Sequence, residues 1–418
     1  MYRTAALVVA LLGILCPSMP AAAAEAPLVE KYLTEGRLAV GEKELQQHLR
    51  NHPDDDQARF GLGTLQFLKA VERLGQSLHR YGALGPQSRL ARAIPLVRLP
   101  VPQNPKPEPI GYEDSRKMVE QWLADMQAVE QTLAPIKDRE VKLPLHFGLI
   151  ALDLNGDGQA GGDETLWRIY AVLNNGLRLS PEFTPEEVQN FVIAFDYGDV
   201  HWLRGYCRLL SAIGEMTLAY DQRSVFDAIA HQLFDNPKGA AIPEELFPRR
   251  EDRPFESEIA DFIAAIHLAR FPLKEPQRMQ AARKHLLAVV EHSRESWKAI
   301  AAETDDDREW IPSSKQKGVI PNVQVSAEMI QGWQSFLGEA EQLLEGKKLV
   351  PHWRLVEGRG VNLKRVFDEP REFDLVMWVH GAAAVPYVEA GPTTQLETWT
   401  RLNALFGGQF IGFAFWFN

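Results

Sequence analysis

The chain has 418 residues, of which 45% are hydrophobic and 24% are charged, an ordinary globular composition that can bury a large core. Its 45 basic and 56 acidic residues give a formal net charge of −11, which argues against nucleic acid or an anionic lipid surface as the main partner. At about 150 residues per domain, this length corresponds to two or three domains.

Residues 1–24 have the pattern of a signal peptide. Arg3 supplies a positive charge, Ala5–Cys16 is an apolar run, and the small residues at 21–24 favour cleavage at that point. The run is short for a membrane-spanning helix, and no other stretch is long and apolar enough to span a bilayer. We therefore expect export through a Sec-type route to a periplasmic or secreted location, with no membrane span after cleavage.

The cysteine count excludes an internal disulfide in the exported chain. Cleavage would remove Cys16 and leave Cys207 alone. Cys207 lies within the apolar-rich helical stretch Trp202–Leu210, so we expect a buried, inert thiol.

The region 25–92 is predicted to be a helical hairpin. A helical pattern over Glu30–Arg50 is broken at residues 51–53, and the aspartates at 54–56 can cap a second helix from about Gln57. Leu62-Gly63, an aromatic residue one turn later and the proline before the second helix together resemble a tetratricopeptide repeat over about residues 28–85. An ordinary helical hairpin is the alternative, because no second copy follows at a 34-residue period.

The region 93–112 is predicted to be an extended linker. Prolines this dense are incompatible with a helix or a central strand and favour a polyproline-like path. We place the first domain boundary here. The prolines concerned are Pro95, Pro100, Pro102, Pro105, Pro107 and Pro109.

The region 113–346 is predicted to be a helical, bundle-like core. Thr184 and Glu187 form a capping-box pattern that opens a helix running through Phe195, and Gly346 is placed to end the last helix. The remaining helices are expected at about 118–129, 145–152, 165–173, 259–268, 277–303 and 326–346.

The region 347–418 is predicted to be small, mixed and rich in aromatic residues. Short strands are expected at 353–356 and 360–367, followed by a buried helix over 373–387. The aromatic end at 410–418 is expected to belong to the core. A second interpretation of this end is an envelope-associated protein anchored by it, since a terminal aromatic strand is typical of outer-membrane barrels.

The segment Asp153–Glu164 carries the most specific pattern in the chain. Its sequence, DLNGDGQAGGDE, matches D-x-[DN]-x-[DN]-G-x5-E at all twelve positions. It resembles an EF-hand, the helix–loop–helix family that binds the calcium ion (Ca2+). Calcium takes six to eight oxygen ligands, so a short loop must place an oxygen on alternate residues as it wraps the ion.

The resemblance implies a role for individual residues. Asp153, Asn155 and Asp157 would offer side-chain oxygens, Gln159 its backbone carbonyl, and Glu164 both carboxylate oxygens. Gly158 would take a left-handed conformation that a side chain disfavours. The flanks at 145–152 and 165–173 would be the entering and exiting helices.

Two departures from the EF-hand pattern weaken the implied site. Ala160 replaces the large aliphatic residue that pairs two loops, and Thr165 stands where an apolar residue is common. No second loop of this pattern exists in the sequence. We therefore expect an unpaired site with a dissociation constant near 10⁻⁴–10⁻³ M, which serves structure rather than signalling.

A second group of polar residues allows an alternative function. Asp196, Asp199 and His201 could hold a transition metal or perform acid–base chemistry, with Glu215 as a further carboxylate on the same helix. The competing interpretation is that Gly198 ends one helix and Asp199 caps the next. The sequence has no recognisable protease, esterase, phosphate-binding or dinucleotide motif.

Taken together, these patterns predict a mainly α-helical exported protein. It would combine a repeat-like N-terminal hairpin, a proline-rich linker, a helical core that carries one EF-hand loop, and a small mixed C-terminal region. The predicted function is structural calcium binding within a protein that interacts with other proteins, and not catalysis. The alternative is a hydrolase of unrecognised type with a site near Asp196, Asp199 and His201.

Overall fold

The computed structural model describes residues 26–85, 88, 90, 97, 99–169, 184–242, 246, 254–319, 325–408, 410, 413 and 414. Over this part the protein is mainly helical, as predicted, and the strands form small two-stranded antiparallel sheets. None of the described helices has the length and apolar composition needed to cross a bilayer. The predicted signal peptide and its cleavage site lie outside the described residues.

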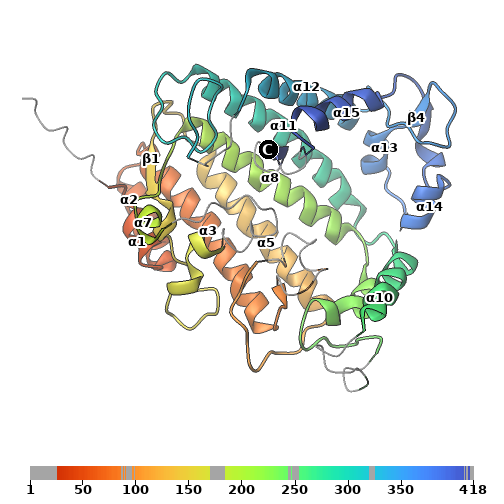
Figure 1. Cartoon of the computed structure of the whole chain (residues 1–418), viewed down its shortest axis with the longest axis horizontal. Coiled ribbons are helices and arrows are strands. Elements are labelled where there is room, and N and C mark those ends of the chain that lie inside the picture. Colours follow the sequence, from red (N-terminus) through yellow and green to blue (C-terminus); the bar gives the residue numbers. More distant parts are fainter. Residues whose placement is uncertain are drawn as a thin grey trace, which may run out of the picture.

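Long helices stacked side by side form the centre of the molecule (Figure 1). In order of packing they are α3 (Asp56–Arg80), α5 (Tyr112–Leu133), α8 (Tyr197–Ala219), α11 (Pro276–Ala302) and α12 (Ala327–Leu344). Each helix in this series contacts the next, so α8 is covered by α5 on one side and by α11 on the other. The bundle-like core predicted from the sequence is therefore present.

The N-terminal hairpin consists of α1 (Glu30–Thr34), α2 (Leu38–Asn51) and α3. The single helix predicted over 30–50 is divided at Gly36, whose φ of +63° favours glycine. Asp55 caps α3 as predicted, because its side chain accepts the amide of Ala58 at 2.9 Å.

The apolar side of α3 faces inward. Leu62, Leu65, Leu68 and Leu78 are buried in one core with α2 and α5. The surface at 62–78 is therefore not available to a protein partner. The hairpin itself is confirmed, while its tetratricopeptide-like character stays a prediction.

From residue 99 to residue 109 the proline-rich segment belongs to no helix or strand and lies against the end of α3, while Pro95 lies outside the described residues. The Pro102 carbonyl is 2.8 Å from Nδ1 of His79, and the amide of Glu108 donates to the Arg80 carbonyl at 2.9 Å. Leu99 and Ile110 are buried in the core shared by α3, α5 and α8. The segment thus packs into the same apolar core as the helices that precede and follow it in the chain.

Two short strands replace helices that the sequence predicted. Strand β1 (Leu143–His146) pairs with β2 (Val192–Phe195), with His146 opposite Val192, and β1 continues into the 3₁₀ helix η2 (Phe147–Leu149). The helix predicted at 145–152 is therefore wrong. The β-branched pair Val192-Ile193 favours a strand, and its pairing with β1 decides the conformation of both segments.

The capping box at Thr184 and Glu187 is present, but its helix is shorter than predicted. Helix α7 (Pro185–Gln189) ends before strand β2, so the prediction of a helix through Phe195 is wrong. Beyond α8 the chain forms α9 (Arg223–Ile229), the 3₁₀ helix η4 (Ala230–Gln232) and α10 (Phe255–Leu268).

The C-terminal region is mixed, as predicted, but its elements differ from those expected. Residues 353–356 form turns, and the expected strand at 360–367 is β4 followed by helix α13. The buried helix expected over 373–387 is β5 followed by the exposed helix α14 and the 3₁₀ helix η7. The bounds are β4 (Arg359–Val361), α13 (Leu363–Asp368), β5 (Phe373–Asp374), α14 (Leu375–His380), η7 (Val385–Tyr387), β6 (Val388–Ala390) and α15 (Leu396–Leu405).

One small sheet and an aromatic cluster attach this region to the helices. Strand β5 pairs with β3 (Arg270–Phe271), which follows α10, while β4 pairs with β6. The Phe410 ring lies 5.0 Å from that of Phe336 and 6.2 Å from that of Trp333, centroid to centroid. Phe410 therefore packs on the core, as predicted, and residues 415–418 lie outside the described residues.

Candidate functional site

The loop at 153–164 is organised around the carboxylate of Asp153. Its Oδ1 accepts the amides of Gly156 at 2.7 Å and Asp157 at 3.1 Å, and its Oδ2 accepts the amide of Gly158 at 3.0 Å. Gly156 and Gly158 have φ of +77° and +83°, which a side chain would disfavour. The chain therefore wraps around the first acidic residue of the motif.

The last acidic residue closes the same loop. Oε1 of Glu164 accepts the amides of Leu154 at 3.0 Å and Asn155 at 3.1 Å. Only 7% of Glu164 is exposed, and burial raises the pKa of its carboxyl despite the two amide donors. Glu164 lies in the short 3₁₀ helix η3 (Gly162–Glu164). The two ends of the motif are thus brought together, although Glu164 comes ten positions after Leu154 in the sequence.

The middle residues of the motif line the turn between these ends. Oδ1 of Asn155 accepts the amide of Asp157 at 2.8 Å, and Oδ1 of Asp157 accepts the amide of Gln159 at 2.8 Å. The five residues predicted to bind calcium, Asp153, Asn155, Asp157, Gln159 and Glu164, therefore belong to one folded loop whose oxygens are already oriented by backbone amides.

This loop is docked on the N-terminal hairpin. The amide of Asp153 donates to Glu72 Oε2, and Nε2 of Gln76 donates to the Asp153 carbonyl, both at 2.9 Å. Leu154 is fully buried against α3, where a Cβ added to Gly75 would lie 2.6 Å from a Leu154 methyl group. The loop is consequently part of the packing of α3 and is not a free surface turn.

Glu72 is an acidic residue of this site that the sequence motif does not include. Burial, helped by the charges of Asp153 and Glu164, raises the pKa of its carboxyl to about 7. Glu72 therefore adds a partly buried carboxyl beside the loop, and Lys69 is a nearby cation that acts on it. Glu72 lies on α3, far from the motif in the sequence, so only the tertiary fold could have revealed it.

The flanks of the loop differ from those of an EF-hand. The predicted entering helix is replaced by β1, η2 and an extended stretch, and Ala151 pairs with Thr165 in an antiparallel bridge. Residues 166–169 are helical after the loop, and the rest of the predicted exiting helix lies outside the described residues. An EF-hand-like loop is thus present between flanks closed by a β-bridge.

The second predicted group, Asp196 and Asp199, caps α8. Oδ1 of Asp196 accepts the amides of Gly198 at 2.7 Å and Asp199 at 3.3 Å, and Asp199 Oδ2 accepts the amide of Asp196 at 3.1 Å. Carboxylates of this group do cap a helix, but the predicted assignment is wrong in both details, because Gly198 follows strand β2 instead of ending a helix and Asp199 is not the cap. The cap is Asp196, Gly198 lies inside the helix, and Asp199 is its third residue.

Two glutamates that the sequence did not single out complete a buried acidic cluster at this helix end. Oxygen atoms of Asp196, Glu303 and Glu309 lie within 4.8 Å of one another. Burial and the Asp196 charge raise the pKa of Glu303 to about 8, and burial raises that of Glu309 to about 7. Burial and the same charge raise the pKa of Asp199 well above its usual value. Such carboxyls can share protons or hold a hard cation.

The residues of the hydrolase alternative do not converge. His201 Nδ1 lies 3.4 Å from Nδ1 of His292, while Asp196 and Asp199 are engaged with backbone amides. Glu215 forms an ion pair with Arg278 at 2.9 Å. The aspartate pair, His201 and Glu215 therefore take part in three separate sets of contacts and do not form one site.

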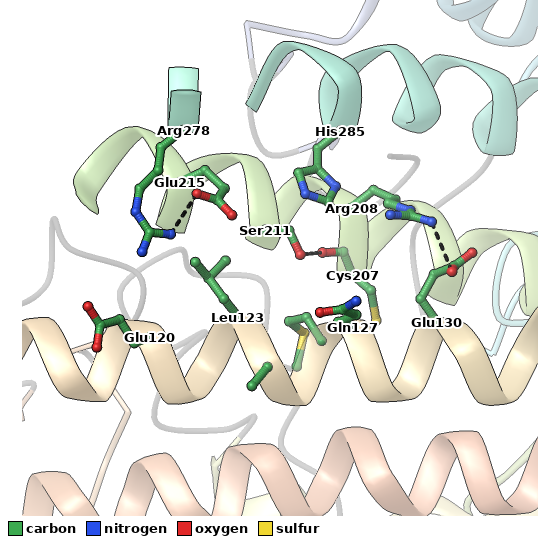
Figure 2. A pocket seen from close by; sticks show the side chains of 12 residues that line it. Glu120, Leu123, Gln127, Glu130, Cys207, Arg208, Ser211, Glu215, Arg278 and His285 are labelled. Carbon is green, nitrogen blue, oxygen red and sulfur yellow. Dashed lines mark hydrogen bonds and ion pairs between the residues drawn. The ribbon is translucent and has the colours of Figure 1, made fainter. Parts of the chain in front are cut away.

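A polar groove of about 390 Å³ lies where α5 and α11 both meet α8 (Figure 2). Arg208 contacts Glu130 at 2.9 Å, and Arg278 contacts Glu215. Of the hydrolase candidates only Glu215 lines this groove. Cys207 also lines it, and it is buried as predicted, so that burial raises the pKa of its thiol. A buried, protonated thiol is a poor nucleophile.

No protein-family model matches this chain, and neither a curated protein nor a solved structure matches it significantly.

Proposed function

We propose that this protein binds one calcium ion in the loop Asp153–Glu164. The observation that supports it most is the folded loop, in which the carboxylates of Asp153 and Glu164 are each held by backbone amides. Orienting the ligands before the ion arrives reduces the ordering cost of binding. The donor set consists of oxygens alone, which suits calcium better than a transition metal.

The role proposed for the ion is to stabilise the fold. The loop contacts α3 through Glu72, Gln76 and the buried Leu154, and its neighbour Ala151 donates its amide to the Leu33 carbonyl at 3.0 Å. An ion that tightens the loop would therefore also hold α1 and α3 in place. At ten times its dissociation constant, calcium would add about 1.4 kcal/mol to the free energy of unfolding.

The remaining parts of the prediction form one consistent proposal. The N-terminal sequence supports export, and a dissociation constant near 10⁻⁴–10⁻³ M is typical of calcium modules outside the cell. An exported protein with a stabilising calcium site, in which the described candidates Asp196, Asp199, His201 and Glu215 do not converge, fits an interaction or scaffold protein better than a hydrolase.

Calorimetric titration with calcium, beside a Glu164→Gln variant, tests the site. We expect the wild-type chain to bind one ion and to gain melting temperature, and the variant to lose both effects because one ligand charge is gone. A Gln159→Ala variant is the matched control, since Gln159 would coordinate through its backbone carbonyl and should bind normally. Absence of binding up to 10 mM calcium would refute the proposal.

A further inference from the structure

Helix α10 turns its apolar side to the solvent. Ile259, Phe262, Ile263 and Ile266 follow the i, i+3, i+4, i+7 spacing that normally faces a core. All four are exposed instead, Phe262 by 65% and Ile263 by 60%, and α10 has no buried residue. An apolar stripe placed outward in this way indicates that a partner covers it.

The polar side of α10 attaches it to the rest of the molecule. Oδ2 of Asp261 lies 3.0 Å from Nε2 of His231 and accepts Nε2 of Gln232 at 2.6 Å. At its C-terminal end the chain enters β3, and the Ala269 carbonyl accepts the amide of Leu375 at 2.9 Å. The orientation of the stripe is therefore fixed by polar contacts on the opposite side of the helix.

Helix α14 places further exposed apolar residues beside α10. It begins directly after β5, the strand that pairs with β3, so α10 and α14 meet at this ladder near one edge of the molecule (Figure 1). Trp378 stacks on Tyr387 with ring centroids 5.9 Å apart, which anchors α14 from one side. Its other apolar residues are exposed, namely Leu375, Val376, Met377 and Val379.

We infer that this surface pairs two copies of the chain across a two-fold axis, with the α10 helices antiparallel. The stripe is nearly symmetric along its length. An antiparallel arrangement sets Ile259 opposite Ile266 of the second copy and Phe262 opposite Ile263 of the second copy, so every apolar residue of the stripe meets another. Such self-complementarity is what an isologous interface requires.

The size of the surface also agrees with a dimer. With usual side-chain areas, the exposed parts of the four residues on α10 and the four on α14 amount to roughly 700 Å² of apolar surface. A stable interface buries about 800 Å² on each partner, so this surface and a polar rim suffice. An anionic membrane is a poorer partner, because the chain carries a net charge of −11.

Sedimentation velocity of the full chain tests the dimer. We expect a dimer at 20–50 µM, and a Phe262→Asp/Ile263→Asp variant with an unchanged melting temperature and a dimer dissociation constant at least 100-fold weaker. Val40→Asp is the matched control, because Val40 is an exposed apolar residue of α2 and should leave the dimer intact. A monomeric wild type at 100 µM, or a dimeric double variant, would overturn the inference.

Cysteine cross-linking tests the antiparallel geometry. In a Cys16→Ser background, Ile259→Cys/Ile266→Cys should form a disulfide-linked dimer under mild oxidation. Ile259→Cys alone should not, since its two copies would lie about 10 Å apart along the helices. Equal cross-linking of the single variant would contradict the arrangement. Flotation of a monomeric wild type with phosphatidylcholine vesicles, lost in the Phe262→Asp/Ile263→Asp variant, would instead assign the surface to lipid.

Discussion

Two groups of acidic side chains in this molecule are assembled in opposite ways. The loop at 153–164 collects its carboxylates from consecutive residues, on a turn that reaches the surface. The cluster at the start of α8 collects Asp196, Asp199, Glu303 and Glu309 from two distant segments, with Asp199 and Glu309 buried and Asp196 and Glu303 partly buried. The first group is visible in the sequence, and the second exists only because α11 ends beside the beginning of α8.

The two groups also differ in how their negative charge is offset. In the loop, Asp153 alone accepts three backbone amides. In the buried cluster the carboxyls lie against one another, and the pKa values of Glu303 and Glu309 rise to about 8 and 7. In the cluster, burial and the charge of Asp196 favour the protonated forms of Glu303 and Glu309, whereas the loop surrounds its first carboxylate with three amide donors. Proximity of acidic residues therefore does not by itself define a metal site.

The largest effect is expected from Leu154→Ala, which tests whether the loop is part of the core. Leu154 is fully buried against α3, so the cavity should lower the free energy of unfolding by about 3 kcal/mol in urea denaturation. Gln159→Ala, in the exposed part of the same loop, should change it by less than about 0.5 kcal/mol. Equal small effects would show that the loop is an independent surface feature.

A second prediction concerns the acidic cluster at the start of α8 and the pH dependence of the free energy of unfolding. Glu303 binds its proton more tightly in the folded chain than in the unfolded one, since its folded pKa is about 8 against an ordinary 4.5. Its stabilising effect is complete below pH 4.5 and is lost as pH rises through 8. We expect the free energy of unfolding to fall by about 2 kcal/mol between pH 5.5 and 8.5 without added calcium.

Glu303→Gln should reduce that decline, because an amide cannot ionise and can still bond to Gln316, while Glu309 and Glu72, whose pKa values are about 7, continue to contribute. Urea denaturation at the two pH values measures the difference. A decline of the same size in the variant would mean that Glu303 is not the residue that loses the proton.

The smallest effect distinguishes the two groups as calcium ligands. Asp153→Asn should abolish the stabilisation by calcium, about 1.4 kcal/mol at ten times the dissociation constant, because it removes a ligand charge from the loop. Asp196→Asn should retain it, since asparagine also caps helices well and the buried cluster is not the proposed site. Thermal melts with and without calcium give both values. The reverse result would transfer the calcium site to the start of α8.

Sequence patterns predicted the features whose cause is local. The helices α3, α5, α11 and α12, the cap at Asp55, the capping box at Thr184 and the folded loop at 153–164 each depend on neighbouring residues. The same reasoning assigned helices at 145–152 and 192–195, where pairing between β1 and β2 decides the outcome. That pairing joins segments far apart in the chain, and periodicity over short apolar runs cannot distinguish a strand from a helix there.

The parts of the candidate sites that were missed are those supplied by other elements. Glu72 reaches the loop from α3, and Glu303 and Glu309 reach Asp196 from the end of α11 and the segment after it. The sequence also did not predict that the apolar stripe on α10 faces the solvent. Its spacing predicts a helix correctly but does not tell whether the apolar side meets the core or the solvent.

The proline-rich segment determines how small a piece of this chain could remain folded. Besides contacting α3, Ile110 donates its amide to the Asn236 carbonyl at 3.0 Å and accepts the amide of Lys238 at 2.7 Å. Cutting the chain at these prolines would split one apolar core and expose apolar surface on each half. The hairpin of α2 and α3 therefore belongs to the same cooperative unit as α5 and α8, and we expect them to unfold in a single transition.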